Sequence, residues 1–231
     1  MEDDGFTLVT GRKAANKKFK KTENGTHIRI DGSENDIRKA MESAKIDISR
    51  AGLATFVAEK LELAVAAIQN SSIRKFWLIG NGHFDGRDEP GAHQLALFLE
   101  LSAHFQCDLV FQEPVCSHAE KNWLREQKID IREASDTKID IPEGISVLGM
   151  IHGEHELLEQ FLEHNRRKID NLIVIGNNYG GVDWTLSKLK AKSPRINEFF
   201  EKSSVTPFPE VYEPHGSAFS GTVIMSPVVD Q

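Results

Sequence analysis

The residues best placed for chemistry follow two apolar runs. Phe76 to Ile79 ends in Gly80-Asn81-Gly82, and Leu109 to Phe111 is followed closely by Glu113. Glycines let the backbone approach a ligand, a following helix offers amides to anions, and a carboxylate can accept hydrogen bonds from ribose hydroxyls. This order is typical of nucleotide-binding α/β domains. However, the third glycine, Gly86, lies one residue beyond the usual fingerprint, and the missing Gly-Lys-Ser/Thr excludes a phosphate-loop ATPase.

Other apolar runs also end in polar residues. In doubly wound sheets, ligands bind outside the carboxyl ends of the strands, near the point where the strand order reverses. This rule predicts that the polar residues at these strand ends form the rim of a pocket. Tyr179 directly follows the last of them, Asn178. The predicted cofactor-binding residues are Gly80, Asn81, Gly82, His83, Glu113, His152, Asn177 and Asn178. The alternative is that these glycines and asparagines simply terminate strands.

The stretch His152-Gly153-Glu154-His155 places two imidazoles three residues apart. They could share zinc or iron with Glu113 or Glu154, or one imidazole could ligate haem. We expect no bound metal, because the pattern is not the helical His-Glu-x-x-His motif. We instead expect His152 to act as an acid, a base or a hydrogen-bond donor, which makes it the best catalytic candidate.

Nucleophilic catalysis finds less support. The sequence has no Gly-x-Ser-x-Gly elbow, and its only cysteines are Cys107 and Cys116. A predicted helix N-terminus could lower the pKa of Cys116, but neighbouring Glu113 would oppose that shift. We expect two free, inert thiols in a reducing compartment.

The elements that would position these residues alternate between strand and helix. Continuous apolar runs at 76–79, 107–112 and 172–175 are typical of parallel strands that helices cover on both faces. We predict further strands at 128–132 and 145–151, helices at 90–105, 117–127 and 154–165, and one edge strand within 219–225. The sequence therefore predicts an α/β fold, a Rossmann-like three-layer sandwich with a mostly parallel sheet and an N-terminal helical extension.

The N-terminal part has a different composition. Residues 1–32 are polar, and we predict a flexible arm with an acidic start followed by a basic stretch from Arg12 to Lys21. Ser33, with Asp36 three residues later, is a predicted helix N-cap. Residues 33–231 are then one domain, with a helical extension over 33–70 and an α/β core over 71–231.

Charge and hydropathy limit the possible partners. The net charge of −7 argues against a protein coated in nucleic acid, and no aromatic stacking platform accompanies the basic stretch. That stretch could be a nuclear address, a contact for an anionic surface or a solvated tail. No apolar run approaches the roughly 18 residues of a membrane span, and the acidic start does not resemble a secretion signal. We therefore expect a cytoplasmic and nuclear protein without membrane insertion, which binds protein partners or a small ligand.

The order of the strand-end motifs resembles the SRR-like (sensitivity to red light reduced) domain family of plants, fungi and animals. The resemblance extends over roughly residues 70–225, with the acidic-aromatic start and the basic stretch as further support. The departures from the usual residue types are His83, Glu113, Gly153 and Gly221. The matching segments are Ile79 to Phe84, Gln94 to Leu97, Glu113-Pro114, Met150 to Gly153, Ile175 to Tyr179 and Phe219 to Thr222.

This resemblance implies a regulatory protein rather than an enzyme. Members are linked to circadian-rhythm regulation, to the control of haem biosynthesis and to microtubule-related phenotypes, and the resemblance carries no established reaction. The alternative is a transferase that uses S-adenosylmethionine or another adenosine-containing cofactor, supported by Gly80, Gly82 and Glu113. A haem or metal binder that uses His152 is a third, weaker hypothesis.

Overall fold

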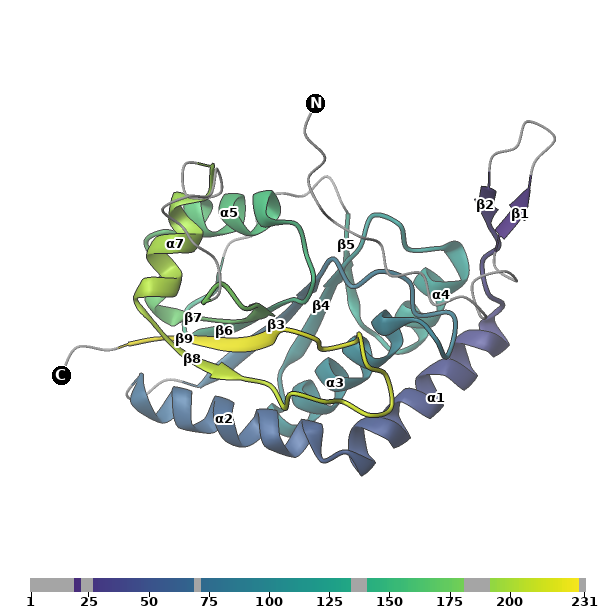
Figure 1. Ribbon diagram of the computed structural model, residues 1–231, viewed down its shortest axis with the longest axis horizontal. Helices are drawn as coiled ribbons and strands as arrows, with labels where there is room; N and C mark the ends of the chain where they lie inside the picture. Colours follow the sequence, from purple (N-terminus) through teal and green to yellow (C-terminus); the bar gives the residue numbers. More distant parts are fainter. Residues whose placement is uncertain (1–18, 22–26, 69–71, 134–140, 181–191, 229–231) are drawn as a thin grey trace.

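The computed structural model of the protein describes residues 19–21, 27–68, 72–133, 141–180 and 192–228. In these residues six α-helices surround a seven-stranded, mostly parallel sheet, which confirms the predicted Rossmann-like α/β fold (Figure 1). The strands are β3 (Ile73–Ile79), β4 (Asp108–Gln112), β5 (Asp130–Arg132), β6 (Ile145–Met150), β7 (Leu172–Asn177), β8 (Ser203–Pro207) and β9 (Thr222–Pro227). The helices are α1 (Glu34–Arg50), α2 (Leu53–Ala67), α3 (Pro90–Phe105), α4 (His118–Glu126), α5 (His155–His164) and α7 (Pro194–Glu201), and a 3-10 turn, Ile169–Asn171, precedes β7.

The strand order is β5-β4-β3-β6-β7-β9-β8. From β3 the chain adds β4 and β5 on one side, then returns to place β6 and β7 on the other side. All of these pairs are parallel. The strand order therefore reverses between β3 and β6, where a doubly wound fold usually binds its ligand.

The C-terminal strand corrects one prediction. Residues 219–225 were expected to contain an edge strand, but β9 lies inside the sheet, antiparallel to both β7 and β8. The edge strand on this side of the sheet is β8, a five-residue segment after α7 that the sequence pattern did not reveal. Its side chains are at most half-buried, because no further strand covers it, and its residues therefore lack a continuous apolar run.

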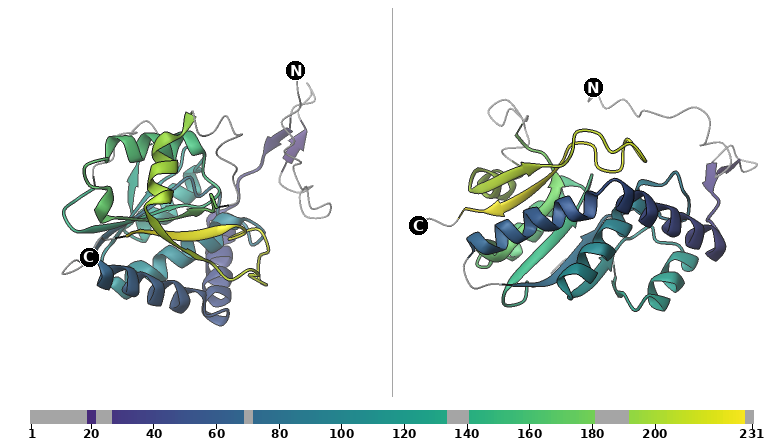
Figure 2. Two further views of the ribbon diagram at one scale, coloured as in Figure 1. Left: turned by 60° about the vertical axis from the view of Figure 1, so that its left-hand side comes forward. Right: turned by 90° about the horizontal axis from the view of Figure 1, so that it is seen from below.

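Alternate residues of each central strand face opposite layers. Phe76 and Leu78 pack into the core beneath α1 to α4, while Trp77 and Ile79 pack into the core beneath α5 and α7. Figure 2 shows the two helical layers on opposite sides of the sheet. Helix α3 approaches the sheet closely, because a Cβ on Gly149 of β6 would lie 2.2 Å from the ring of Phe98.

Local signals explain where the helices begin. The Ser33 side chain accepts the Asp36 amide and the Asp36 carboxylate accepts the Ser33 amide, a capping box that confirms the predicted start of α1. Helices α1 and α2 pack on α3, so the predicted helical extension covers one face of the sheet. Before α1, the short strands β1 (Phe19–Lys21) and β2 (His27–Arg29) pair antiparallel. Most of the predicted basic stretch lies outside the described residues.

None of the described helices is long and apolar enough to cross a membrane.

Candidate functional site

The turn after β3 is open towards one side and packed on the other. Gly80 and Gly82 have φ angles of +70° and +71°, and a Cβ on either would meet no atom within 4 Å. The turn rests on the first turn of α3, where a Cβ on Gly91 would lie 2.4 Å from the carbonyl oxygen of His83. The glycines thus allow the left-handed conformations of the turn, and the described residues leave free the space that a side chain at Gly80 or Gly82 would occupy.

Glu113 holds this turn in place. Its carboxylate accepts the Gly82 amide at 2.6 Å through Oε2 and the Val115 amide at 3.0 Å through Oε1. The side chain is buried, since Glu113 is 7% exposed. Both oxygens that were predicted to bind ribose therefore already accept a backbone amide, and the Gly82 amide is not free to bind a phosphate.

His83 contacts a carboxylate that the sequence analysis did not select. Its Nδ1 lies 3.0 Å from Oε2 of Glu120, and the Glu120 carboxylate also accepts the amides of Phe84 at 2.6 Å and Ser117 at 2.7 Å. The hydrogen bond that His83 donates to the Glu120 carboxylate raises the pKa of His83. Burial opposes ionisation of Glu120, but the hydrogen bonds from His83, Phe84 and Ser117 outweigh it and lower the pKa of that carboxyl group.

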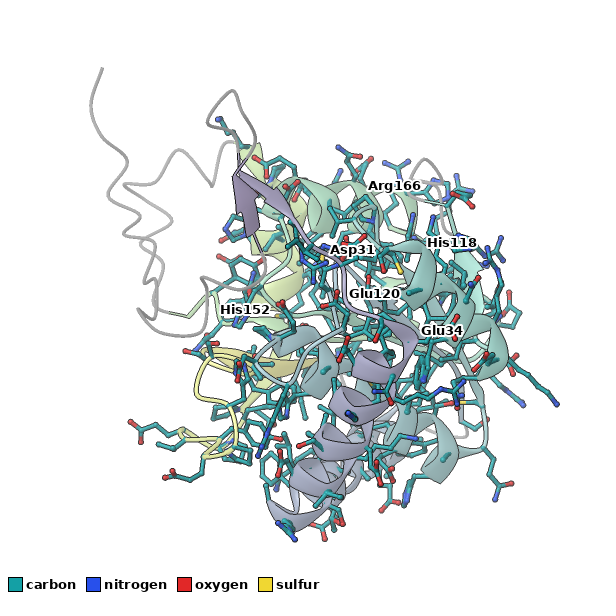
Figure 3. The ribbon with its side chains drawn as sticks, turned by 90° about the vertical axis from the view of Figure 1, so that its right-hand side faces the viewer. Asp31, Glu34, His118, Glu120, His152 and Arg166 are labelled. Atoms are coloured by element: carbon teal, nitrogen blue, oxygen red, sulfur yellow. The ribbon has the colours of Figure 1, made fainter. Side chains whose placement is uncertain are left out.

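Asp85 joins this cluster to the segment before α1. Its side chain is fully buried; Oδ1 accepts Nη2 of Arg29 at 2.5 Å and Oδ2 accepts the Gly32 amide at 2.6 Å. Ligand atoms of His83, Asp85 and Glu120 all lie within 4.8 Å of one another, a spacing compatible with one metal ion. Figure 3 labels Asp31 and Glu120 on this side of the molecule.

The end of β6 forms a second group, with neutral partners. His152 has a φ of +56°, its amide donates to Oδ1 of Asn177 at 3.0 Å, and its Nε2 lies 2.8 Å from the carbonyl oxygen of Ser220. Asn177 also donates to the Gly153 carbonyl oxygen. His152 is exposed, so an imidazole nitrogen remains accessible to solvent or to a ligand. The structure thus brings His152 and Asn177 together, as the sequence predicted.

The two histidines of His152-Gly153-Glu154-His155 bond to different groups. Nδ1 of His155 lies 3.1 Å from the hydroxyl of Tyr179, while His152 contacts Ser220. Asn178 binds the loop before β9 through its amide, which donates to Gly221.

Both cysteines are free thiols. Burial raises the pKa of Cys107 to about 11, and burial together with Glu120 raises that of Cys116 to about 12. A thiol with such a pKa is almost entirely protonated at neutral pH, which makes it a poor nucleophile.

Asn81 carries a buried polar atom with no partner in the described part of the chain. The residue is 4% exposed, its Nδ2 donates to the Gly82 carbonyl oxygen, and its Oδ1 makes no hydrogen bond there. Such an acceptor is costly to bury and often marks a missing donor from a ligand or water. A cavity of about 590 Å³ lies elsewhere, between α1, the segment before it and the loop after β3.

Three contributors to the site were missed by the sequence analysis: Arg29, Asp85 and Glu120. Glu120 had a local signal, because Ser117 and Glu120 form a capping box at the start of α4. Asp85 and Arg29 lie 56 residues apart, and nothing local indicates that they meet.

No curated protein matches the chain. A crystal structure of protein 1320 from Thermoplasma acidophilum is 15% identical, covers 84% of this chain and 96% of that chain, and has a TM-score of 0.37. The family model described as SRR1 domain matches residues 53–226. The matched residues run from the start of α2 into β9 and contain every residue of the predicted pocket.

Proposed function

The chain belongs to the SRR1 domain family, and from that premise we propose that it is a regulatory protein of circadian rhythm and haem biosynthesis. It acts by binding a ligand or protein partner at the carboxyl edge of its sheet. The residues proposed to bind are those of the predicted pocket, from Gly80 to His83 with Glu113, His152, Asn177 and Asn178. Residues 1–32 serve as an arm, and residues 33–231 form the domain.

The observation that supports a binding role is that the Glu113 carboxylate is already hydrogen-bonded to backbone amides. A dinucleotide-dependent enzyme of this fold needs free turn amides for the pyrophosphate. Here the Glu113 carboxylate and the Gly82 amide bind each other at 2.6 Å. Asp85, Asp88 and Glu89 also precede α3 and offset the charges of Arg87 and Arg29, so the loop offers no excess positive charge to a pyrophosphate. These features support binding of a partner or ligand other than a dinucleotide.

The enzyme alternative rests on Gly80, Gly82 and Asn81. The space beside Gly80 and Gly82 fits a small ligand, and a donor on that ligand would satisfy Oδ1 of Asn81, which is buried without a partner among the described residues. S-adenosylmethionine and other adenosine-containing molecules have such a donor in their exocyclic amine. Haem is a weaker candidate, because Nε2 of His152 is already held by Ser220.

Thermal unfolding separates these possibilities. The protein is heated with S-adenosylmethionine, NAD, ATP or haemin, and a ligand at about 100 times its dissociation constant adds about 2.7 kcal/mol of stability. We expect no increase in melting temperature with the three adenosine-containing ligands. An increase that Asn81→Ala abolishes and Glu126→Ala, an exposed control, retains would favour the enzyme. Glu113→Ala also removes the bond to the Gly82 amide, so it changes the melting temperature of the protein without ligand. The effect of a ligand on this variant is therefore measured relative to the same variant without ligand.

The regulatory role is tested in cells that lack the gene. Rhythm period and haem content are measured in the same cells, and unchanged values of both would contradict the proposal. Localisation to cytoplasm and nucleus is tested with a fluorescent fusion. Replacing the lysines and arginines between Arg12 and Lys21 by glutamine should lower the nuclear fraction if the basic stretch is an address.

A further inference from the structure

His83, Asp85 and Glu120 present one imidazole and two carboxylates to a common point. Their ligand atoms lie within 4.8 Å of one another. An ion bound at roughly 2.0–2.2 Å by nitrogen and oxygen holds its ligand atoms up to roughly 4.4 Å apart, so little movement is needed. One imidazole with two carboxylates suits zinc, manganese or iron better than magnesium or calcium, which prefer oxygen ligands alone.

The cluster is buried and needs positive charge. The side chains of Asp85 and Glu120 are 0% exposed and that of His83 is 18% exposed. Two carboxylates without water around them are costly unless a cation compensates them. Arg29 supplies positive charge to Asp85, with Nη2 at 2.5 Å from Asp85 and at 3.5 Å from Glu89, whereas Glu120 is paired with His83 at 3.0 Å.

Arg29 belongs to the segment before α1 and not to the α/β core. The same segment places the Gly32 amide against Asp85 at 2.6 Å, and a Cβ on Gly32 would lie 2.6 Å from the Asp85 carbonyl oxygen. The cavity of about 590 Å³ borders this contact, and Asp31, Gly32, Asp85 and Gly86 line part of it. The cavity thus reaches Asp85, one of the three residues of the cluster, beside the segment.

We propose that His83, Asp85 and Glu120 form a site for a divalent transition-metal ion, and that Arg29 takes the place of this ion in the structure described here. The ion replaces the proton between Nδ1 of His83 and Oε2 of Glu120, and it replaces the guanidinium at Asp85. Glu120 keeps its bonds to the Phe84 and Ser117 amides, because each carboxylate oxygen has a second lone pair. Metal binding and docking of the Arg29 segment therefore exclude each other.

The test is a Mn²⁺ titration of the full-length, chelator-treated protein, in which electron paramagnetic resonance measures free Mn²⁺. By linkage, a variant that weakens docking of the segment must bind the ion more tightly. We expect Arg29→Ala to lower the dissociation constant at least about fivefold, within the usual range of such couplings. Gly32→Ala should act in the same direction because its methyl group displaces the segment. Arg38→Ala, which removes the exposed ion pair with Glu126, is the control and should match the wild type.

The ligands are tested separately. Asp85→Asn should remove Mn²⁺ binding from the Arg29→Ala protein, and Zn²⁺ should displace Mn²⁺ from it. Pulsed resonance should detect imidazole nitrogen coupled to bound Mn²⁺, and His83→Gln should remove that coupling. If circular dichroism shows that Asp85→Asn is unfolded, His83→Gln, which changes a more exposed side chain, tests whether the cluster binds the ion.

Two results would overturn the proposal. One is failure of both the wild type and Arg29→Ala to bind Mn²⁺. The other is equal affinity of these two proteins, because competition with Arg29 requires a difference.

Discussion

The two halves of the carboxyl edge, on either side of the strand reversal between β3 and β6, are built differently. In the charged half, Glu113, Glu120 and Asp85 are buried and their carboxylates bind backbone amides, His83 and Arg29. In the neutral half, His152 is exposed, and its neighbours Asn177 and Ser220 bind it through uncharged groups.

The difference assigns a different role to each half. A buried ionic network is costly to desolvate and stabilises the fold only when every member is satisfied, so it fixes one arrangement of the turn, α4 and the segment before α1. Exposed neutral groups exchange their partners with water at little cost. We therefore expect the neutral half to accept a partner with little rearrangement, and the charged half to change only when a cation or the Arg29 segment is exchanged.

The largest expected effect is that of Glu120→Ala. This change leaves His83 and the amides of Phe84 and Ser117 without their acceptor in a buried site. Removal of one partner from a buried ionic network costs roughly 3–5 kcal/mol, and we expect a loss of that size in the free energy of unfolding, measured in urea. Glu126→Ala removes an exposed carboxylate from the same helix and should cost below about 1 kcal/mol. Similar values for the two variants would break the contrast between a network and a surface pair.

A smaller effect is expected from pH. The pKa of His83 is raised in the folded state, so its contribution to stability is fully present below the usual histidine pKa of about 6.5 and is lost as the pH rises through the folded-state pKa. The pKa of Glu120 is lowered in the folded state. The contribution of this carboxylate to stability is therefore present above the usual glutamate pKa of about 4.5 and is lost as the pH falls through the folded-state pKa.

The urea unfolding free energy, measured with a chelator present, should therefore fall between about pH 6.5 and alkaline pH in the wild type. His83→Gln should flatten this part of the profile. A profile that His83→Gln does not alter would show that the charged half does not depend on this ion pair.

How much of the fold and of the candidate site the sequence could predict depends on how far apart in the chain the interacting residues lie. Helix α3 was predicted at its observed bounds, 90–105, and Ser33 at its observed cap, because apolar spacing and capping residues act within one or two turns. The pairing of Gly82 with Glu113 follows from adjacent parallel strands, although the use of the carboxylate as a brace does not. The contact of Arg29 with Asp85 depends on how the segment before α1 folds back, which no local pattern encodes.

The smallest expected effect concerns His152, and it tests whether the neutral half is loosely held. His152 has a φ of +56°, a left-handed conformation that costs a residue with a Cβ about 1–2 kcal/mol, whereas glycine adopts it freely. Its exposed bond to the Ser220 carbonyl oxygen is worth about 0.5–1.5 kcal/mol.

His152→Ala loses the bond and keeps the strain, so we expect a loss of about 1 kcal/mol in unfolding free energy. His152→Gly loses the same bond but relieves the strain, so it should stay within about 0.5 kcal/mol of the wild type. If His152→Gly instead cost as much as Glu120→Ala, the neutral half would be as tightly constrained as the charged half. A partner could then bind it only by breaking contacts that hold β6 and β7 together.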